Sequence, residues 1–146
     1  MNTLDHSTST VDDCRIINLP CHRAGDGTLT VAENSVAIPF AIRRIYYIYD
    51  IPSSSERGGH SHHTEQRLLI AASGCFDVRV CDGRQWRTFT LKKPDQALYI
   101  PAGIWRVLNN FSSGSVVLAL SSTRFDENDY VRDFKKFTLL KGCIEE

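Results

Sequence analysis

The amino-acid sequence predicts an all-β domain, either a sandwich or a barrel, that ends in a short helix. Roughly eight to ten short runs of β-branched, aromatic and aliphatic residues follow one another at a spacing of about 8–12 residues, which is typical of these folds. Turn-forming Gly, Pro, Asp and Ser separate the runs. Helical spacing of apolar residues occurs only near the C-terminal end.

Each expected strand is an apolar or alternating run that stops at a turn signal. The expected strands cover residues 15–19, 28–32, 42–51, 68–72, 76–80, 86–91, 97–100, 107–111 and 116–120. Residues 42–51 (IRRIYYIYDI) are the clearest, because nearly all of them are β-branched or aromatic. Asp82 and Gly83 form a hairpin signal between two of the runs. Residues 116–120 are continuously apolar, which favours a strand buried on both faces.

The expected helix lies in the C-terminal tail. Residues 126–129 (DEND) are able to cap a helix, and Tyr130, Phe134 and Phe137 follow at helical spacing. Gly142 is the expected stop.

Length and composition describe an ordinary globular domain. The 146 residues fit one core, so we expect a flexible N-terminal leader over residues 1–13 and a single domain over residues 14–146. The leader is polar and lacks the apolar stretch of a signal peptide. Seventeen basic residues balance seventeen acidic ones, which argues against a broad surface for nucleic acid or anionic membranes. No apolar run reaches the roughly 18 residues of a membrane span.

The five cysteines argue for a reducing compartment. Their number is odd and no C-x-x-C occurs, so a disulfide scaffold or a zinc cluster is not expected. We therefore expect the cytoplasm.

Three of the five histidines gather at residues 60–63 (HSHH), directly after Gly58 and Gly59. In a strand, residues two apart point to one face, so His60 and His62 would face inward together and His63 outward. Imidazoles beside a Gly-Gly that permits close backbone approach favour a functional site. The alternative is an exposed polar loop that carries histidines by chance.

The strand at residues 42–51 carries candidate site residues on one of its faces. Alternation places Arg44, Tyr46 and Ile48 together. A phenol beside imidazoles is able to act as an acid or to orient a sugar hydroxyl, although tyrosines in strands more often only pack. Arg44, together with Arg57 and Arg106, would form a clamp for a pyrophosphate. Surface solvation is the alternative for Arg44 and Arg57, and a structural ion pair is the alternative for Arg106.

Two motifs resemble those of the cupins. Residues 60–62 (HSH) and residues 101–110 (PAGIWRVLNN) match the frame in which that family places two histidines and a carboxylate, then a third histidine. The resemblance implies a double-stranded β-helix or jelly-roll barrel. Here Gln66 stands where glutamate is expected, next to Glu65, and Arg106 stands where the third histidine is expected. Since arginine has no free lone pair, we expect no metal in this pocket unless Glu65 contributes.

A narrower resemblance covers residues 15–137. It is to the WxcM-like nucleotide-sugar 3,4-ketoisomerases, which act on dTDP-4-keto-6-deoxyglucose. The matching stretches are residues 38–40 (IPF), 44–47 (RIYY), 57–62 (RGGHSH), 98–105 (LYIPAGIW), 110–113 (NFSS) and 125–130 (FDENDY), followed by Arg132. The resemblance implies a cytoplasmic isomerase without metal or cofactor, which supplies deoxysugars for surface glycans such as O-antigen or for antibiotics. It also implies a homodimer that exchanges N-terminal strands.

The same resemblance assigns the site residues. His60, His62 and Tyr46 match catalytic positions, and Arg44, Arg57, Arg106 and Gln66 match the substrate pocket. The hypothesis is that His60 removes the C3 proton of a dTDP-linked 4-keto-6-deoxy sugar, that His62 and Tyr46 shuttle protons, and that Arg106 stabilises the oxyanion or the phosphate. The alternatives are a dTDP-sugar 3,5-epimerase, a metal-dependent cupin enzyme and a non-catalytic sugar-nucleotide sensor.

Overall fold

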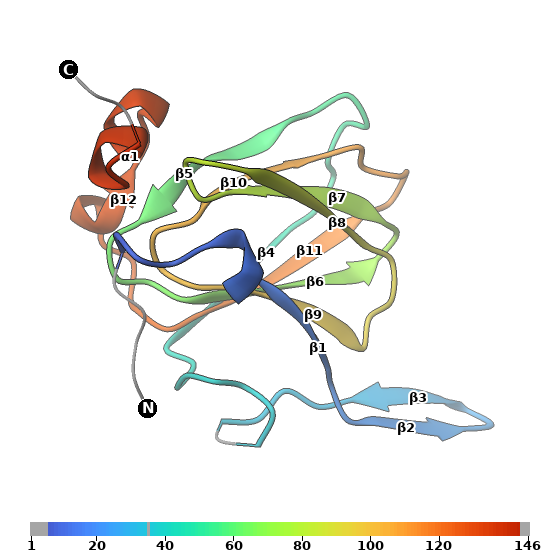
Figure 1. The fold of residues 1–146 in the computed structure, drawn as a ribbon. Helices are drawn as coiled ribbons and strands as arrows, with labels where there is room; N and C mark the ends of the chain where they lie inside the picture. The colour runs from blue at the N-terminus through green and yellow to red at the C-terminus, as the bar shows by residue number, and fades with distance from the viewer. Residues whose placement is uncertain (1–5, 35, 144–146) are drawn as a thin grey trace.

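The computed structural model describes residues 6–34 and 36–143 and shows two antiparallel sheets packed face to face (Figure 1). The first sheet has the order β1 (Arg15–Asn18), β9 (Gln96–Ile100), β6 (Arg67–Ser73), β11 (Val116–Ser121) and β4 (Arg44–Ile48). The second has the order β12 (Tyr130–Val131), β5 (Arg57–His62), β10 (Trp105–Asn109), β7 (Phe76–Cys81) and β8 (Trp86–Leu91). This jelly-roll arrangement confirms the expected fold class.

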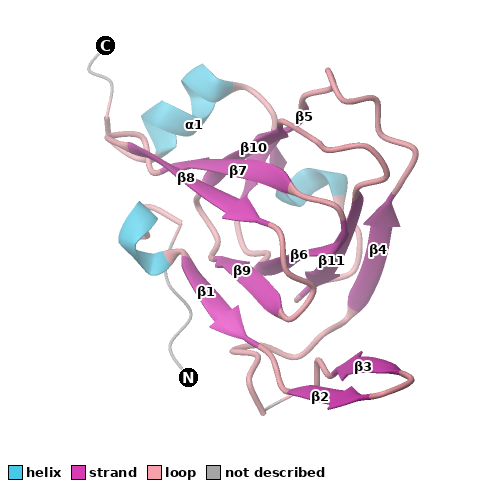
Figure 2. Ribbon diagram, turned by 90° about the vertical axis from the view of Figure 1, so that its right-hand side faces the viewer, coloured by secondary structure: helices cyan, strands magenta, loops and turns pink. Residues whose placement is uncertain are grey.

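A hairpin of β2 (Cys21–Ala24) and β3 (Gly27–Thr30) stands away from the two sheets, as Figure 2 also shows. The remaining elements are two 3₁₀ turns, Val11–Asp13 and Glu127–Asp129, and the helix α1 (Phe134–Leu140). Within the residues that the structure describes, no helix is long and apolar enough to cross a membrane.

In its central strands β6, β9 and β11, the first sheet is covered on both faces. Its inner face, with Leu69, Ala71 and Val117, packs into the core between the sheets. Its outer face, with Leu68 and Leu120, packs under the segment that follows the hairpin. This double burial explains why residues 68–71 and 116–120 carry nearly continuous apolar runs.

Strand β4 shows the alternation that the sequence predicts. Arg44, Tyr46 and Ile48 line an inner cavity. Ile45, Tyr47 and Tyr49 point the other way, with exposed fractions of 60–63%. Strand β4 lies at the edge of the sheet, beside β11. Its outward-facing side chains are exposed to solvent in the single chain.

The C-terminal prediction was wrong in one part. Asp126 caps the 3₁₀ turn Glu127–Asp129 rather than α1, and Tyr130 lies in β12, where it pairs with His62. Asp133 caps α1 instead, and its side chain accepts a hydrogen bond from the Lys135 backbone. The helix ends at Leu140, and the expected stop, Gly142, follows two residues later with φ +70°.

The expected leader does not extend to residue 13. Ser9 and Val11 are buried, and Thr10 closes a capping box with Asp13. The Lys141 ammonium donates hydrogen bonds to the Ser9 carbonyl and hydroxyl. Residues 9–13 of the segment expected as a leader therefore pack against the fold. The first five residues of that leader lie outside the described part of the chain.

Candidate active site

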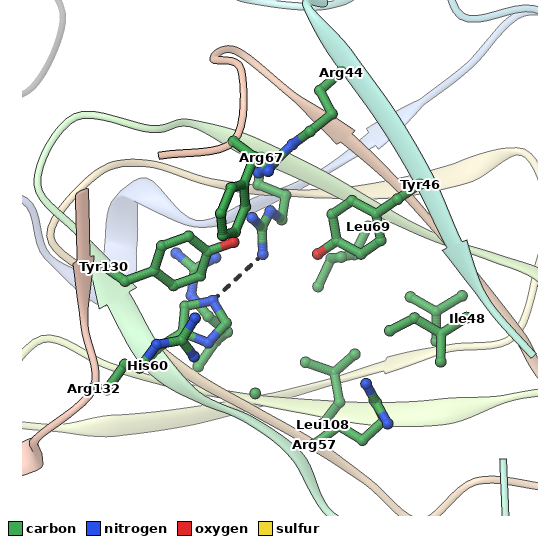
Figure 3. Close-up of a pocket in the computed structure, with 14 residues that line it drawn as sticks. Arg44, Tyr46, Ile48, Arg57, His60, Arg67, Leu69, Leu108, Tyr130 and Arg132 are labelled. Atoms are coloured by element: carbon green, nitrogen blue, oxygen red, sulfur yellow. Dashed lines mark hydrogen bonds between the residues drawn. The ribbon is translucent and has the colours of Figure 1, made fainter. Parts of the chain in front are cut away.

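A cavity of about 410 Å³ opens between the two sheets. Its apolar walls come from Ile48, Leu69, Leu108 and Val117. The polar side chains that line it are Arg44, Tyr46, Arg57, His60, Arg67, Arg106, Tyr130 and Arg132 (Figure 3). Gly58 and Phe125 complete the lining. A concave apolar site with convergent polar groups is the usual form of a small-molecule pocket.

The two histidines of β5 face the interior together, as predicted. Their ring centroids lie 4.9 Å apart and the rings are perpendicular. His60 lines the cavity and is 9% exposed, whereas His62 is 0% exposed and lies behind it. Tyr130 packs its ring on both, at centroid distances of 4.9 and 4.3 Å. Only His60 of the pair is therefore in position to touch a ligand.

Two carboxylates flank His62. Its Nε2 lies 3.2 Å from Glu65 Oε2, and its Nδ1 lies 3.3 Å from Asp129 Oδ2. Asp129 is itself held by the Thr64 backbone and hydroxyl, both at 2.8 Å, and by the Glu65 backbone at 3.1 Å. This network fixes the end of β5 on which His62 sits.

Glu65 is also the centre of a buried ion-pair cluster. Arg44 Nη2 donates to its Oε1 over 2.6 Å, and Arg67 Nη2 donates to its Oε2. Thr123 adds a hydroxyl donor to Oε1 at 3.0 Å. The other terminal nitrogen of Arg67 lies 3.4 Å from His60 Nε2, the contact drawn in Figure 3.

Arg106 is 1% exposed and has no carboxylate partner among the described residues. Its Nε and Nη2 donate to the Ile104 carbonyl over 3.2 and 3.1 Å. Its Nη1 has no hydrogen-bond partner in the described part of the chain. A buried guanidinium with an unused donor at a cavity wall is suited to bind an anion.

Burial and the arginines keep both imidazoles neutral. Burial, together with the charges of Arg106, His62 and Arg67, lowers the pKa of His60 to about 2. Burial lowers the pKa of His62 to about 4 against the opposing hydrogen bond of Asp129. Burial also lowers the pKa of Arg106 to about 10, with Arg67 adding to the effect. Near pH 7 the arginines therefore carry the positive charge of the site.

The structure brings six of the seven predicted residues together. His60, Tyr46, Arg44, Arg57 and Arg106 line the cavity, and His62 lies directly behind it. Gln66 does not belong to the cavity, because the Tyr99 hydroxyl donates to its Oε1 over 2.7 Å on the outer side of the first sheet. Alternation along β6 explains this, since Gln66 and Arg67 point to opposite faces.

Sequence reasoning missed Arg67, Tyr130 and Arg132 as cavity residues and Asp129 as a partner of His62. The signal for Arg67 was present, because it shares a face with Leu69 and Ala71 in a strand that is otherwise apolar. The other three were hidden by the helix expected over that segment.

The donors present do not fit a divalent cation. His60 Nε2 faces the Arg67 guanidinium, and Glu65 is engaged by two arginines. A fixed positive charge at this distance repels a metal ion. Among the residues that the structure describes, no cluster of three or more His, Cys, Asp and Glu is arranged to hold a metal.

Comparison with known proteins places these features in a family. The model of the family FdtA, described as WxcM-like, C-terminal, matches residues 12–142. The TDP-4-oxo-6-deoxy-α-D-glucose-3,4-oxoisomerase of Aneurinibacillus thermoaerophilus is 33% identical over 123 residues, which cover 84% of this chain and 88% of that protein.

Two solved structures share the architecture closely. A 3,4-ketoisomerase from Helicobacter canadensis superposes with a TM-score of 0.87 at 36% identity, over 89% of this chain and 98% of that one. A variant of the 3,4-ketoisomerase QdtA from Thermoanaerobacterium thermosaccharolyticum, in complex with TDP-4-keto-6-deoxyglucose, superposes with a TM-score of 0.84 at 31% identity, over 86% of this chain and 91% of that one.

Proposed function

The chain belongs to the WxcM-like FdtA family, and from this premise we propose that it is a nucleotide-sugar 3,4-ketoisomerase. Its substrate is a dTDP-linked 4-keto-6-deoxyhexose, which it converts to the 3-keto isomer. The observation that carries the proposal is the neutral imidazole of His60 in an apolar cavity beside Arg67 and Arg106. A base next to fixed cations suits proton abstraction alpha to a carbonyl.

His60 takes the C3 proton of the sugar. The C–H electron pair forms the C3–C4 double bond, and the carbonyl pair moves to O4 to give an enediolate. Arg106 lines the cavity and has an unused donor in its Nη1, so its guanidinium stabilises this negative charge. The anionic substrate also raises the pKa of His60 in the complex, because it compensates the imidazolium that forms.

Tyr46 moves the proton between the two oxygens. Its phenol lines the cavity, and burial raises its pKa, so it stays protonated near pH 7. O4 gains a proton and O3 loses one. The protonated His60 then gives its proton to C4 as C3 becomes the carbonyl, which returns His60 to its neutral form. Atoms and electrons balance without an oxidant. His62, which does not reach the cavity, supports His60 from behind.

The remaining arginines of the lining suit the diphosphate of the nucleotide. Arg44, Arg57 and Arg132 line the cavity, and Arg57 and Arg132 are also exposed to solvent. Guanidinium groups bind phosphate oxygens in pairs, so this position anchors the charged part of the substrate while the sugar enters the apolar part.

We also propose that the protein is a homodimer in the cytoplasm that exchanges N-terminal strands and supplies sugars for surface glycans such as O-antigen. The outward face of β4 and the projecting β2–β3 hairpin, with Leu29 58% exposed, support an interface with a second copy. Light scattering after gel filtration tests the dimer, and a monomeric mass at micromolar concentration contradicts it.

Proton NMR of dTDP-4-keto-6-deoxyglucose with the purified protein in D₂O, without added metal, tests the activity. Loss of the C3 proton signal and growth of a 3-keto species are expected. Deuterium at C3 and C5 with an epimerised product would instead indicate the epimerase alternative. Binding without any exchange would indicate a sensor.

A further inference from the structure

Arg67 is the charged side chain that connects the base His60 to the buried carboxylate network. It comes from β6 and is 2% exposed. One terminal nitrogen pairs with Glu65, and the other contacts His60 Nε2. Its guanidinium also lies over the Tyr46 ring, 5.2 Å from the centroid. Arg67 thus contacts both the proposed base and the residue proposed to move the proton between the oxygens.

The hydrogen bond between Arg67 and His60 is chemically possible in only one direction. A guanidinium has donors and no acceptor, so His60 Nε2 must be the acceptor. A neutral imidazole that accepts at Nε2 carries its proton on Nδ1. The Gly58 backbone also interacts with the His60 ring and favours a proton on it. No hydrogen bond of good geometry reaches Nδ1 among the described residues, so the Arg67 contact at Nε2 is the side-chain contact that selects the tautomer.

Charged and titratable groups from several strands face His60. Arg106 of β10 and Arg67 of β6 are cationic, and His62 of β5 is the third group that disfavours an imidazolium. The phenols of Tyr46 on β4 and Tyr130 on β12 share the same space. The nearest carboxylates, Glu65 and Asp129, contact His62 and not His60. Positive charge therefore dominates around His60.

Glu65 keeps Arg67 in place. Its two oxygens divide between Arg67 and Arg44, so the Arg67 guanidinium is tethered on one side and presents its other nitrogen to His60. The contact with His60 is long, 3.4 Å, which leaves the Nε2 lone pair weakly engaged and available to a C–H bond that enters the cavity.

We propose that Arg67 is a positioning residue that holds His60 as a neutral base, with its proton on Nδ1 and its lone pair on Nε2. The proposal rests on the ketoisomerase function, which it deepens by naming the group that prepares the base. In Ser-His-Asp triads, where a carboxylate controls the tautomer, loss of that control costs about 10⁴ in kcat. We expect a decrease of tenfold or more in kcat here.

The deciding experiment is ¹⁵N NMR of the histidine side chains, with the His60 signals assigned from the H60N variant. The wild-type protein should show one tautomer, with Nε2 unprotonated near pH 7. In Arg67→Met the Nε2–H form should appear, and the pH at which the His60 ring titrates should rise. Arg67→Lys should restore part of the Nδ1–H tautomer and part of the low titration pH, because a lysine ammonium also donates a hydrogen bond. The exposed Arg79 of β7 offers a matched control, and R79M should behave as wild type.

An unchanged tautomer and an unchanged titration in a folded Arg67→Met variant would overturn the proposal. If the single variant does not fold because the buried Glu65 is left with an unpaired charge, the double variant Arg67→Met with Glu65→Gln removes both charges. The ¹⁵N signals of His60 in the double variant then provide the same test. The spectra need no substrate. Tautomer control in a protein that fails to isomerise the sugar would refute the proposed function and leave the role of Arg67 standing.

Discussion

At the scale of single residues, the two histidines of β5 have the same chemistry and different surroundings. His60 meets the cavity, whereas His62 lies between the carboxylates of Glu65 and Asp129 and has no exposed surface. A substitution at each position therefore removes a different property. At position 60 it removes a base, and at position 62 it removes the group that separates two buried acids.

We expect His60→Asn to lower kcat by at least about 100-fold, because a positioned general base contributes about 10²–10⁴. The melting temperature should stay within a few degrees, since Asn is smaller and polar. His62→Asn should lower both kcat and the melting temperature. The readouts are solvent deuterium exchange at C3 and thermal unfolding by circular dichroism. His22→Asn in the exposed hairpin is the control. Wild-type turnover in His60→Asn would exclude this residue as the base.

At the scale of elements, the pairing of β5 with β10 places His60 opposite Arg106. The ladder shifts register between Arg106 and Val107, and Gly58 stands at the shift with φ +92°. A Cβ at Gly58 would lie 2.9 Å from the Arg106 carbonyl oxygen. Only glycine accepts this backbone conformation and this close approach, so the bulge depends on that residue.

Gly58→Ala should therefore push β5 away from β10. We expect a loss of about 1–3 kcal/mol in the free energy of unfolding and a lower kcat/KM, because the distance between His60 and Arg106 changes. Urea unfolding and steady-state kinetics measure the two effects. Gly25→Ala in the β2–β3 turn is the control, since a Cβ there meets nothing within 4 Å. Equal stability of the two variants would show that the bulge tolerates a side chain.

Lys141, the residue that caps the C-terminal end of α1, ties this end of the helix to the N-terminal segment. Lys141 Nζ donates to the carbonyls of His6 and Ser9 over 2.6 and 2.8 Å. Lys141→Met keeps the length and removes the donors, which leaves these carbonyls without the ammonium. We expect a loss of about 2–3 kcal/mol in the free energy of unfolding. Lys136→Met, on the exposed face of the same helix, should change it by less than about 0.5 kcal/mol. Similar urea midpoints for the two variants would contradict this role.

The elements show which parts of the fold a sequence pattern is able to predict. Each expected strand overlaps an observed one, because alternation and turn residues report burial directly. The short strand β12 was missed, because a strand of two residues is too short to show an alternating pattern. Its pairing with β5 also depends on contacts distant in sequence. The site followed the same rule. Strand alternation predicted the inward direction of His60 and Tyr46, and the family resemblance proposed their roles. Asp129 and Tyr130 reach the site only through tertiary pairing.

At the scale of the whole molecule, the burial of two imidazoles couples folding to pH. The unfolded chain protonates His60 and His62 near pH 6.5, but the folded protein resists this until about pH 2 and pH 4, respectively. Below pH 6.5 the unfolded state therefore binds more protons than the folded state, and the free energy of unfolding falls as the pH falls. The lowered pKa values of Glu65 and Asp129 add a further loss below about pH 5, where carboxylates of the unfolded chain become protonated.

We expect the free energy of unfolding to be nearly constant from pH 8 to pH 7 and to fall by about 2–4 kcal/mol between pH 7 and pH 5, since each group contributes up to about 1.4 kcal/mol per pH unit. Urea midpoints across this range measure it. H60N and H62N should each flatten the slope, whereas the exposed His22→Asn should keep it. The two buried imidazoles cause this pH dependence only if both variants reduce it. The carboxylates titrate at lower pH and contribute little in this range. A midpoint that does not change between pH 7 and pH 5 in the wild-type protein would show that the imidazoles are charged in the folded state. His60 would then be unable to act as the base near neutral pH.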